Sequence, residues 1–335
     1  MNYIKILGAS GSKAKNHNTT SFQIFKDIII DAGNVLNALG NETKDINHIF
    51  LTHSHADHIA DLPFIIETFF EERSSPLTIY ALEETIDVLQ KHSFNNKIWP
   101  DFTKIKLLKN DNFSLILKPI KINETINIHN YFIKAIHAEH IDGSCGYIVT
   151  KKNQSFIISG DTYINPILWE EINNNKTIKS LIIECSFPDK LENLATLTKH
   201  LTPSLIAKQL QNLKRKDISI FFYHLKPTYK KELLNDIKKH KLLNYQGKIL
   251  KEGDVIHIDT GNIENTLLSE HKFEEIMKIN LAFTSQHDKK KLLEEILTLT
   301  RKLTNADAGT LYIKSKDEKN LDFKVVQNST LKIKL

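Results

Sequence analysis

Cysteine is scarce in this chain of 335 residues. Cys145 and Cys185 are the only two, too few for a disulfide framework, and we interpret both as small buried apolar residues. We therefore expect a reducing compartment, the cytoplasm. The first ten residues, MNYIKILGAS, lack the charged start, the apolar stretch and the small-residue cleavage site of a secretory signal.

Long apolar runs and a strong charge of one sign are also missing. No apolar run approaches the roughly 18 residues that a membrane-spanning helix needs, which excludes such a helix. The net charge of +5 and the isoelectric point near 8.8 suit an anionic small-molecule substrate, but they fall short of the basic surface of a nucleic-acid-coating protein. Hydrophobic residues at 41% and charged residues at 25% are typical of a globular protein, which excludes disordered and fibrous classes.

Short apolar segments alternate with turn signals and helical patterns up to about residue 258. The strand-like runs are Tyr3–Leu7, Ser21–Asp31, His48–Thr52, Leu77–Tyr80, Tyr131–His137, Cys145–Thr150, Ser155–Ser159, Ile178–Glu184 and Ile218–Tyr223. Helical patterns cover Leu82–His92, Pro203–Lys214 and Tyr229–His240. This interleaving predicts sheets covered by helices in a layered α/β arrangement.

The chain changes character after residue 258. Residues 259–272 are polar and uneven, which predicts a linker. Apolar residues then recur at helical spacing over 273–303, and two strand-like runs follow, Thr310–Lys314 and Leu321–Gln327. We therefore predict a domain over 1–258, a linker over 259–272 and a separate segment over 273–335.

The segment LTHSHADH carries the most informative residues, His53, His55, Asp57 and His58. They follow an apolar run, so they leave the end of a buried strand. Residues two apart on extended backbone point to the same side, which lets His53 and His55 hold one cation together. After the chain turns, Asp57 and His58 are able to reach a second position nearby. Imidazole and carboxylate ligands without thiolate suit zinc, with manganese or iron as alternatives.

Further ligand-type residues stand where other strands end. His140 follows the strand Tyr131–His137, Asp161 follows Ser155–Ser159, and His224 follows Ile218–Tyr223. Strand-to-loop transitions are where α/β folds gather active-site groups. Each residue taken alone also fits a structural role, and His137 competes with His140 as a ligand. Together with the LTHSHADH residues they make up a set large enough for two metals.

The motifs HSHADH, IIIDAG around Asp31, SGDT and the late His224 together resemble the metallo-β-lactamase fold hydrolases over residues 1–258. The resemblance implies an αββα sandwich with a dinuclear site at one edge. It implies that His53, His55 and His140 hold one divalent metal ion, that Asp57, His58 and His224 hold the other, and that Asp161 bridges them. Asp31 matches an acidic residue of this family that orients the ligands.

Three later segments, IIECSFPDK, KHLTPSLIAKQL and YHLKP, resemble the class II 3′,5′-cyclic-nucleotide phosphodiesterases. The resemblance implies a phosphodiesterase that opens cyclic nucleotides to 5′-monophosphates by means of a metal-bridging hydroxide. Asp57 and His200 are its candidate catalytic residues, with His200 as the general acid. Lys226 and Ser186 are candidate substrate-binding residues. Structural alternatives are a packing histidine before the helix at Pro203 for His200 and an ordinary surface lysine for Lys226.

Two other functions stay open. The related tRNA-processing ribonuclease Z shares this layout, but many such enzymes carry a long tRNA-binding arm between the third metal-binding histidine and the bridging aspartate. His140 and Asp161 are only 21 positions apart, so no arm fits, and we do not expect a nucleic-acid partner. The other alternative is a non-catalytic protein that senses a ligand, against which the complete ligand set argues.

The C-terminal stretches KLTNADAGTLYIKSKD and VVQNS resemble the opening of a GAF domain. GAF domains bind small molecules and often mediate dimerisation, so the resemblance implies a homodimer formed through this segment. Too few residues remain for a whole domain. The alternative is an independent helical hairpin appended to the enzyme.

Overall fold

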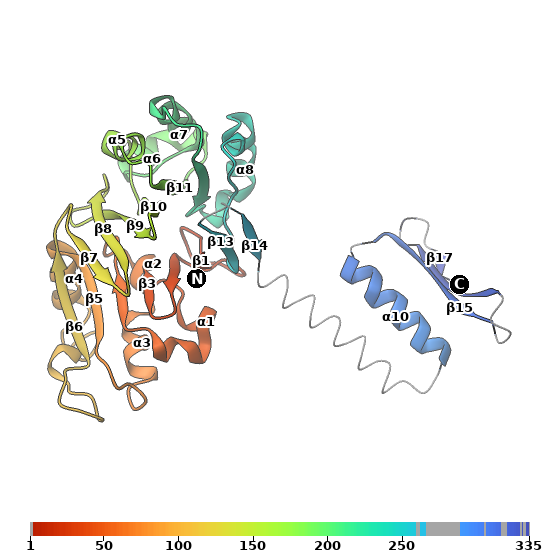
Figure 1. Cartoon of the computed structure of the whole chain (residues 1–335), viewed down its shortest axis with the longest axis horizontal. Coiled ribbons are helices and arrows are strands. Elements are labelled where there is room, and N and C mark those ends of the chain that lie inside the picture. Colours follow the sequence, from red (N-terminus) through yellow and green to blue (C-terminus); the bar gives the residue numbers. More distant parts are fainter. Residues whose placement is uncertain are drawn as a thin grey trace. The chain divides into compact units, whose positions relative to one another are not determined.

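The structure is a computed structural model that describes residues 3–258, 262–265, 289–304, 306–315, 320–328, 330 and 333–334. It divides the chain into two compact units, Met1–Glu264 and Asn265–Leu335 (Figure 1). No helix among the described residues is long and apolar enough to cross a bilayer.

Two sheets form the centre of the first unit. The larger sheet has eight strands in the order β14-β13-β1-β2-β3-β4-β5-β6. Their bounds are β1 Tyr3–Gly8, β2 Ser21–Phe25, β3 Ile28–Ile30, β4 His48–Phe50, β5 Leu77–Leu82, β6 Leu115–Ile120, β13 Asp254–His257 and β14 Ile263–Asn265. The smaller sheet has six strands in the order β12-β11-β10-β9-β8-β7. Their bounds are β7 Thr125–Ile128, β8 Tyr131–His137, β9 Cys145–Lys151, β10 Gln154–Ile158, β11 Ile178–Glu184 and β12 Ser219–Tyr223.

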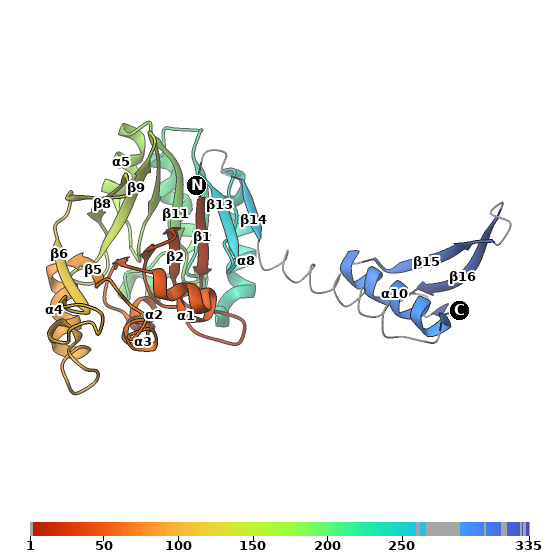
Figure 2. The same ribbon diagram turned by 60° about the horizontal axis from the view of Figure 1, so that its bottom comes forward.

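Helices cover the outer faces of both sheets (Figure 2). The helices are α1 Leu36–Leu39, α2 Ala56–Ile59, α3 Leu62–Thr68, α4 Glu83–His92, α5 Pro166–Asn174, α6 Glu192–Leu197, α7 Pro203–Gln209 and α8 Lys230–Lys239. Short 3₁₀ turns lie at Gly40–Asp45, Phe102–Lys104, Asp189–Leu191, Leu210–Asn212, Pro227–Tyr229 and Leu242–Asn244.

Three apolar cores match this layering. One lies between the sheets and includes Phe22 and Tyr147. A second joins the smaller sheet to α5, α7 and α8, where Trp169 is buried. The third joins the larger sheet to α3 and α4 through residues such as Ile65 and Leu89. The predicted αββα sandwich is therefore confirmed.

Parallel strands in both sheets place the site. Strands β3 to β6 run parallel to one another, and so do β10, β11 and β12. The carboxyl ends of parallel strands meet at one edge of a sheet, and the loops beyond them gather functional side chains. Asp31, His53, Asp161 and His224 all follow such ends.

The sequence prediction was wrong at several elements. The run Ser21–Asp31 is a hairpin, in which β2 and β3 pair Phe25 with Ile28 around the turn residues Lys26 and Asp27. The helix expected over Pro203–Lys214 ends at Gln209 and continues as a 3₁₀ turn. Strands β6, β7, β13 and β14 were not predicted. Residues 263–265 of the predicted linker form β14 at the edge of the larger sheet, whereas 259–261 and 266–272 lie outside the described residues.

The second unit consists of a helix and a small sheet. Helix α10 spans Lys289–Thr304, and strands β15 Ala308–Lys314, β16 Leu321–Asn328 and β17 Ile333–Lys334 form an antiparallel sheet. The two predicted strands correspond to β15 and β16. The first part of the predicted helix, 273–288, lies outside the described residues. Gln327 ties β16 to α10, because its Nε2 donates to the carbonyl of Glu294 at 3.1 Å.

Candidate metal centre

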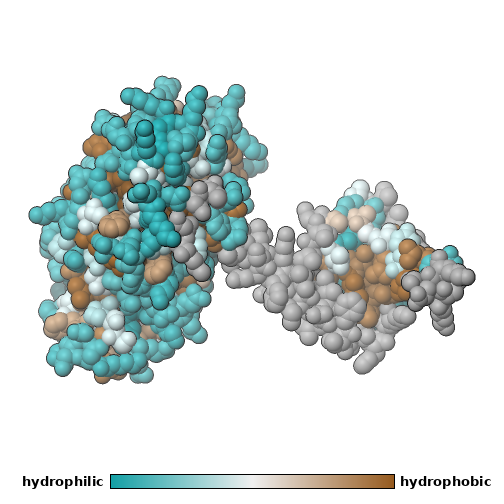
Figure 3. All heavy atoms as spheres, in the orientation of Figure 1, coloured by the Kyte–Doolittle hydropathy of each residue, from teal (hydrophilic) through white to brown (hydrophobic). Residues whose placement is uncertain are grey.

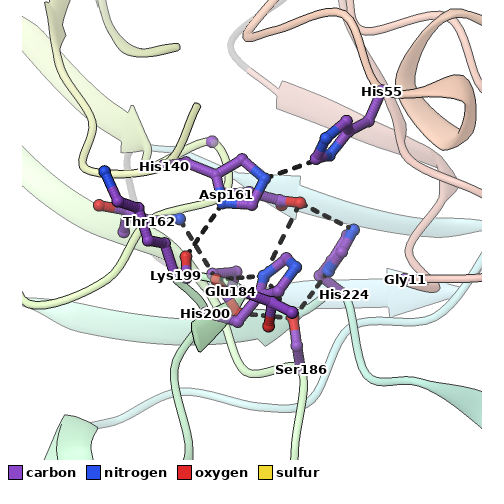
Figure 4. Close-up of polar contacts among 12 residues, drawn as sticks. Gly11, His55, His140, Asp161, Thr162, Glu184, Ser186, Lys199, His200 and His224 are labelled. Atoms are coloured by element: carbon purple, nitrogen blue, oxygen red, sulfur yellow. Dashed lines mark hydrogen bonds and ion pairs between the residues drawn. The ribbon is translucent and has the colours of Figure 1, made fainter. Parts of the chain in front are cut away.

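Six histidines and several carboxylates meet at the carboxyl edge of the two sheets. Figure 4 shows four of these histidines, His55, His140, His200 and His224, around Asp161. The loop after β4 supplies His53 and His55, and the short helix α2 that follows supplies Asp57 and His58. The loops after β8, β10 and β12 supply His140, Asp161 and His224, and His200 precedes α7. All the predicted metal-binding residues are thus brought together.

One group of ligand atoms comes from His53, His55, His140 and Asp161, whose atoms lie within 4.8 Å of one another. His140 Nε2 is 3.1 Å from His55 Nδ1. His53 Nε2 is 3.7 Å from Asp161 Oδ2. His53 is fully buried, whereas His55 is partly exposed.

A neighbouring group comes from Asp57, His58 and His224. The Nε2 atom of His224 lies 3.2 Å from His58 Nε2 and 3.2 Å from Asp57 Oδ2. Asp161 Oδ2 stands beside this group as well, 3.3 Å from His224 Nε2 and 3.4 Å from His58 Nε2. Asp161 is therefore placed between the two groups, as a bridging carboxylate would be.

Three of these histidines have Nδ1 atoms that contact neighbouring oxygen atoms. His58 Nδ1 donates to Asp31 Oδ2 at 2.7 Å, and His140 Nδ1 donates to the carbonyl of Lys199 at 3.0 Å. His224 Nδ1 lies 2.8 Å from Ser186 Oγ. With Nδ1 carrying the proton, the Nε2 lone pairs point inward and are free to bind a metal.

Asp31 and Thr52 connect several of these bonds. Asp31 accepts hydrogen bonds from Thr52 N and Thr52 Oγ1, both at 2.8 Å. Since the Thr52 hydroxyl donates to Asp31, it accepts from His53 Nδ1 at 3.0 Å. One buried carboxylate thus orients His58 directly and His53 through Thr52.

Backbone conformation turns two of these side chains inward. Asp31 has φ of 57° and His224 has φ of 64°, a left-handed conformation that costs energy in residues with a Cβ atom and is kept where the surroundings enforce it. Gly11 packs against His224 so closely that a Cβ atom there would lie 2.6 Å from its Nδ1. A side chain at position 11 would therefore displace His224.

Unsatisfied atoms show that the centre fits a cation. Among the described residues, His53 Nε2 and Asp161 Oδ1 are buried without any hydrogen-bond partner. A buried polar atom left unpaired costs about 1–3 kcal/mol, and a divalent ion would satisfy both. Histidine nitrogens and carboxylate oxygens without thiolates match zinc, manganese or iron.

Electrostatics also favour positive charge at this place. Burial lowers the pKa of His58, but the Asp161 and Asp31 carboxylates outweigh it and raise that pKa well above the usual value. Burial opposes ionisation of Asp161, yet His224 and His58 hold the pKa of its carboxyl well below the usual range. The Asp161 carboxylate therefore remains ionised and favours a cation.

His200 stands beside the centre on a carboxylate that sequence reasoning missed. Its Nδ1 donates to Glu184 Oε1 at 2.8 Å and lies 3.9 Å from Asp161 Oδ2. Burial lowers the pKa of His200, but Glu184 raises it above the usual value overall. Glu184 is itself fully buried at the end of β11. In the sequence, Glu184 stands at a strand end and within the segment IIECSFPDK, but neither feature indicated its role.

The two candidate substrate-binding residues differ in their surroundings. Ser186 is fully buried, donates to Glu184 Oε2 at 2.6 Å and contacts His224, so its hydroxyl has no exposed surface. Lys226 is partly exposed; its Nζ donates to the carbonyl of Gly11 at 3.1 Å and lies 5.1 Å from the centre of the Phe187 ring.

Other sequence candidates lie outside the cluster. His137, which competed with His140, pairs with Glu139 at 3.4 Å on a side chain that is 42% exposed. Cys145 and Cys185 are both buried and free, and burial raises the pKa of each thiol. The centre therefore contains no sulfur ligand among the described residues.

Solved structures show the same fold. The chain superposes on unliganded yeast PDE1 with a TM-score of 0.63 at 21% identity, covering 76% of this chain and 98% of that one. It superposes on the metallo-β-lactamase fold protein YhfI from Bacillus subtilis with a TM-score of 0.59 at 17% identity, covering 76% and 98%. These similarities confirm the predicted fold.

Curated relatives carry names of phosphodiester hydrolases. A probable 3′,5′-cyclic-nucleotide phosphodiesterase of Yersinia pestis is 24% identical over 63% of this chain and 68% of its own length. The 3′,5′-cyclic-nucleotide phosphodiesterase 1 of Saccharomyces cerevisiae is 30% identical over 51% of each chain, so the match spans about half of that relative. A ribonuclease Z of Methanocaldococcus jannaschii is 28% identical over 39% of this chain and 46% of its own length. The predicted enzyme class, a hydrolase of phosphodiester bonds, is confirmed at this level.

A family model also matches the chain, over more of its length than the three curated relatives do. Residues 3–232 match the family described as anti-Pycsar protein Apyc1. This range covers more than half of the 335 residues and includes every predicted metal-binding residue. The chain therefore belongs to the anti-Pycsar Apyc1 family, within the metallo-β-lactamase fold.

Proposed function

We propose that this chain is a metal-dependent phosphodiesterase that opens 3′,5′-cyclic nucleotides to 5′-monophosphates. The observation that carries the proposal is the meeting of two His/Asp ligand groups at Asp161 on one edge of the sandwich. The names of the Yersinia and yeast relatives support the same substrate class.

Two divalent cations, zinc with manganese or iron as alternatives, are the proposed cofactors. His53, His55 and His140 would hold one, Asp57, His58 and His224 the other, and Asp161 would contact both. Such a pair would supply Lewis acidity toward a phosphoryl oxygen and a nucleophile from water at neutral pH. The Asp57 side chain is 25% exposed against 1% for Asp161, so Asp57 marks the side from which substrate would approach.

The surrounding residues hold this geometry in place. Asp31 orients His58 and, through Thr52, His53. We assign Ser186 to the same task, because its hydroxyl accepts from His224 and donates to Glu184. This role replaces the substrate contact predicted for Ser186 from the sequence.

His200 is the proposed proton donor. Opening a cyclic phosphate leaves an alkoxide oxygen that needs a proton at neutral pH. Glu184 occupies Nδ1 of His200, so Nε2 is the nitrogen left to deliver that proton. Lys226 follows His224 by two positions and would attract the anionic phosphate as a point charge.

Ribonuclease Z activity is the second candidate, on the strength of the archaeal relative. The described segment between His140 and Asp161 contains only β9 and β10 with their turns, and no arm for tRNA is inserted there. This observation favours the cyclic-nucleotide substrate.

For the C-terminal unit we propose a role in self-association, with α10, β15 and β16 as the opening of a GAF-like fold. Leu292, Leu293 and Ile296 of α10 are only partly buried, and apolar residues gather on the face of this unit seen in Figure 3. Partly exposed apolar side chains on a small unit are suited to packing against a second copy of the chain.

A hydrolysis screen tests the proposal. The reconstituted protein would be offered 3′,5′-cyclic nucleotides, bis(p-nitrophenyl) phosphate and a tRNA precursor. We expect cyclic nucleotides to yield 5′-monophosphates. Selective cleavage of the tRNA precursor would assign the protein to the ribonuclease class, and no hydrolysis of any substrate would leave a ligand-sensing role.

A further inference from the structure

A separate group of ligand-type side chains lies at the other end of the same strands. Asp27, His48 and His129 place one ligand atom each within 4.8 Å of the others. Strand β3 has Asp27 directly before it and Asp31 directly after it. Strand β4 begins at His48 and is followed by His53. The group therefore lies at the amino ends of β3 and β4, whereas the metal centre lies beyond their carboxyl ends.

Both sheets contribute to this group. Asp27 lies in the β2–β3 turn of the larger sheet, and His48 begins β4 of that sheet. His129 lies in the turn between β7 and β8 of the smaller sheet. His129 Nε2 is 2.9 Å from Asp27 Oδ2 although the two residues are 102 positions apart. The imidazole rings of His48 and His129 have centroids 6.4 Å apart. The group thus bridges the two layers of the sandwich.

Asp27 shows the same unsatisfied chemistry as the metal centre. Asp27 is only 7% exposed, and its Oδ1 atom is buried without a hydrogen-bond partner among the described residues. His129 contacts only the Oδ2 atom of Asp27. An ion pair between these two residues therefore leaves Oδ1 without a partner. Asp161 Oδ1 is orphaned in the same way. Leaving such an atom dry costs free energy that a bound cation would recover.

We propose that Asp27, His48 and His129 bind a divalent transition-metal ion that ties the two sheets together. Two imidazoles and one carboxylate are a ligand set that suits zinc. A cavity of about 580 Å³ is lined by Asp27 and His129, so water is able to reach the group and complete the coordination. The ion binds the folded chain and not the unfolded one, and therefore stabilises the fold by mass action.

Cobalt(II) serves as the probe for the test. The full chain would be stripped with a chelator and reconstituted, and bound cobalt would be counted by elemental analysis alongside its visible absorption. The variants are His129→Gln, His48→Gln and a control, His240→Gln. His129 is half exposed at its side chain, so its substitution leaves the fold intact. His240 pairs with Asp189 at 2.6 Å but belongs to no group of three or more ligands in the described part of the chain.

We expect His129→Gln and His48→Gln each to bind one cobalt ion per chain fewer than the unsubstituted protein, and to lose part of the rise in melting temperature that cobalt causes. His240→Gln should bind as much as the unsubstituted protein. Equal cobalt content in His129→Gln and the unsubstituted protein would overturn the proposal and leave a plain ion pair. The comparison is a difference of one ion, so it is independent of how many ions the catalytic centre holds.

Discussion

The two ends of strands β3 and β4 carry similar residue types in different surroundings. Beyond the carboxyl ends, His53, His58 and Asp161 are buried, and the outer nitrogens of the two histidines are held by buried partners. Before the amino ends, His129 is half exposed and reaches Asp27 from the β7–β8 turn of the other sheet. The difference teaches what the proposed reactive centre has that the proposed ion site shows less of: ligands whose orientation is fixed in advance by a second set of buried hydrogen bonds.

The largest effect is expected from Asp161→Asn. Asp161 is the carboxylate within reach of both ligand groups, so its neutralisation should remove bound metal and nearly all hydrolysis of cyclic nucleotides. Metal analysis and a rate assay check this. Asp217→Asn, at an aspartate with a side chain 56% exposed, is the control. An active Asp161→Asn enzyme with full metal content would remove Asp161 from the centre.

His200→Ala should lose about 10²–10⁴-fold in rate on cyclic nucleotides, the range of a general acid, while keeping its metal content. The loss should shrink on bis(p-nitrophenyl) phosphate, because p-nitrophenolate leaves without a proton. Parallel rate measurements on both substrates make the comparison. An equal loss on both would make His200 a binding or structural residue, and a loss of metal would make it a ligand.

Asp31→Asn should weaken metal binding by about 10–100-fold, a smaller effect than loss of a ligand. The asparagine keeps the shape but no longer offers a charged acceptor to both His58 and Thr52. Competition with a chelator measures the affinity. An unchanged affinity would show that the buried bonds at this end are dispensable, and the contrast with the amino end would disappear.

Truncation after Asn265 should have the smallest effect on catalysis. The first unit contains both sheets and all proposed ligands, so phosphodiesterase activity should stay largely intact while the oligomeric state or solubility changes. Size-exclusion chromatography with a rate assay tests both outcomes. If metal binding were lost instead, the C-terminal unit would be part of the catalytic core.

Much of the fold could be predicted from the sequence, because long apolar runs predict buried strands. Tyr131–His137 and Ile178–Glu184 have the predicted bounds. The hairpin at Lys26 and Asp27 was missed because no glycine, proline or asparagine interrupts the apolar run there. Strand β7 was missed because it alternates exposed and half-buried residues in only four positions.

The candidate site was predictable where its residues cluster in sequence. The motif HSHADH alone predicts metal-binding residues. Asp161 and His224 were predicted as further ligands from their positions at strand ends. Glu184 also stands at a strand end, but its role becomes visible only when folding brings it beside His200. The group of Asp27, His48 and His129 could not be predicted from the sequence either. Its members come from two separate turns and the start of a strand, and only folding brings them together.

The most direct test of the central claim is the activity of the chelated protein as divalent metal is added back. The account predicts that the stripped protein does not open a 3′,5′-cyclic nucleotide, and that 5′-monophosphate formation returns as the ions at the carboxyl edge are replaced. Undiminished hydrolysis by the stripped protein, or less than one equivalent of metal in a fully active sample, would contradict it.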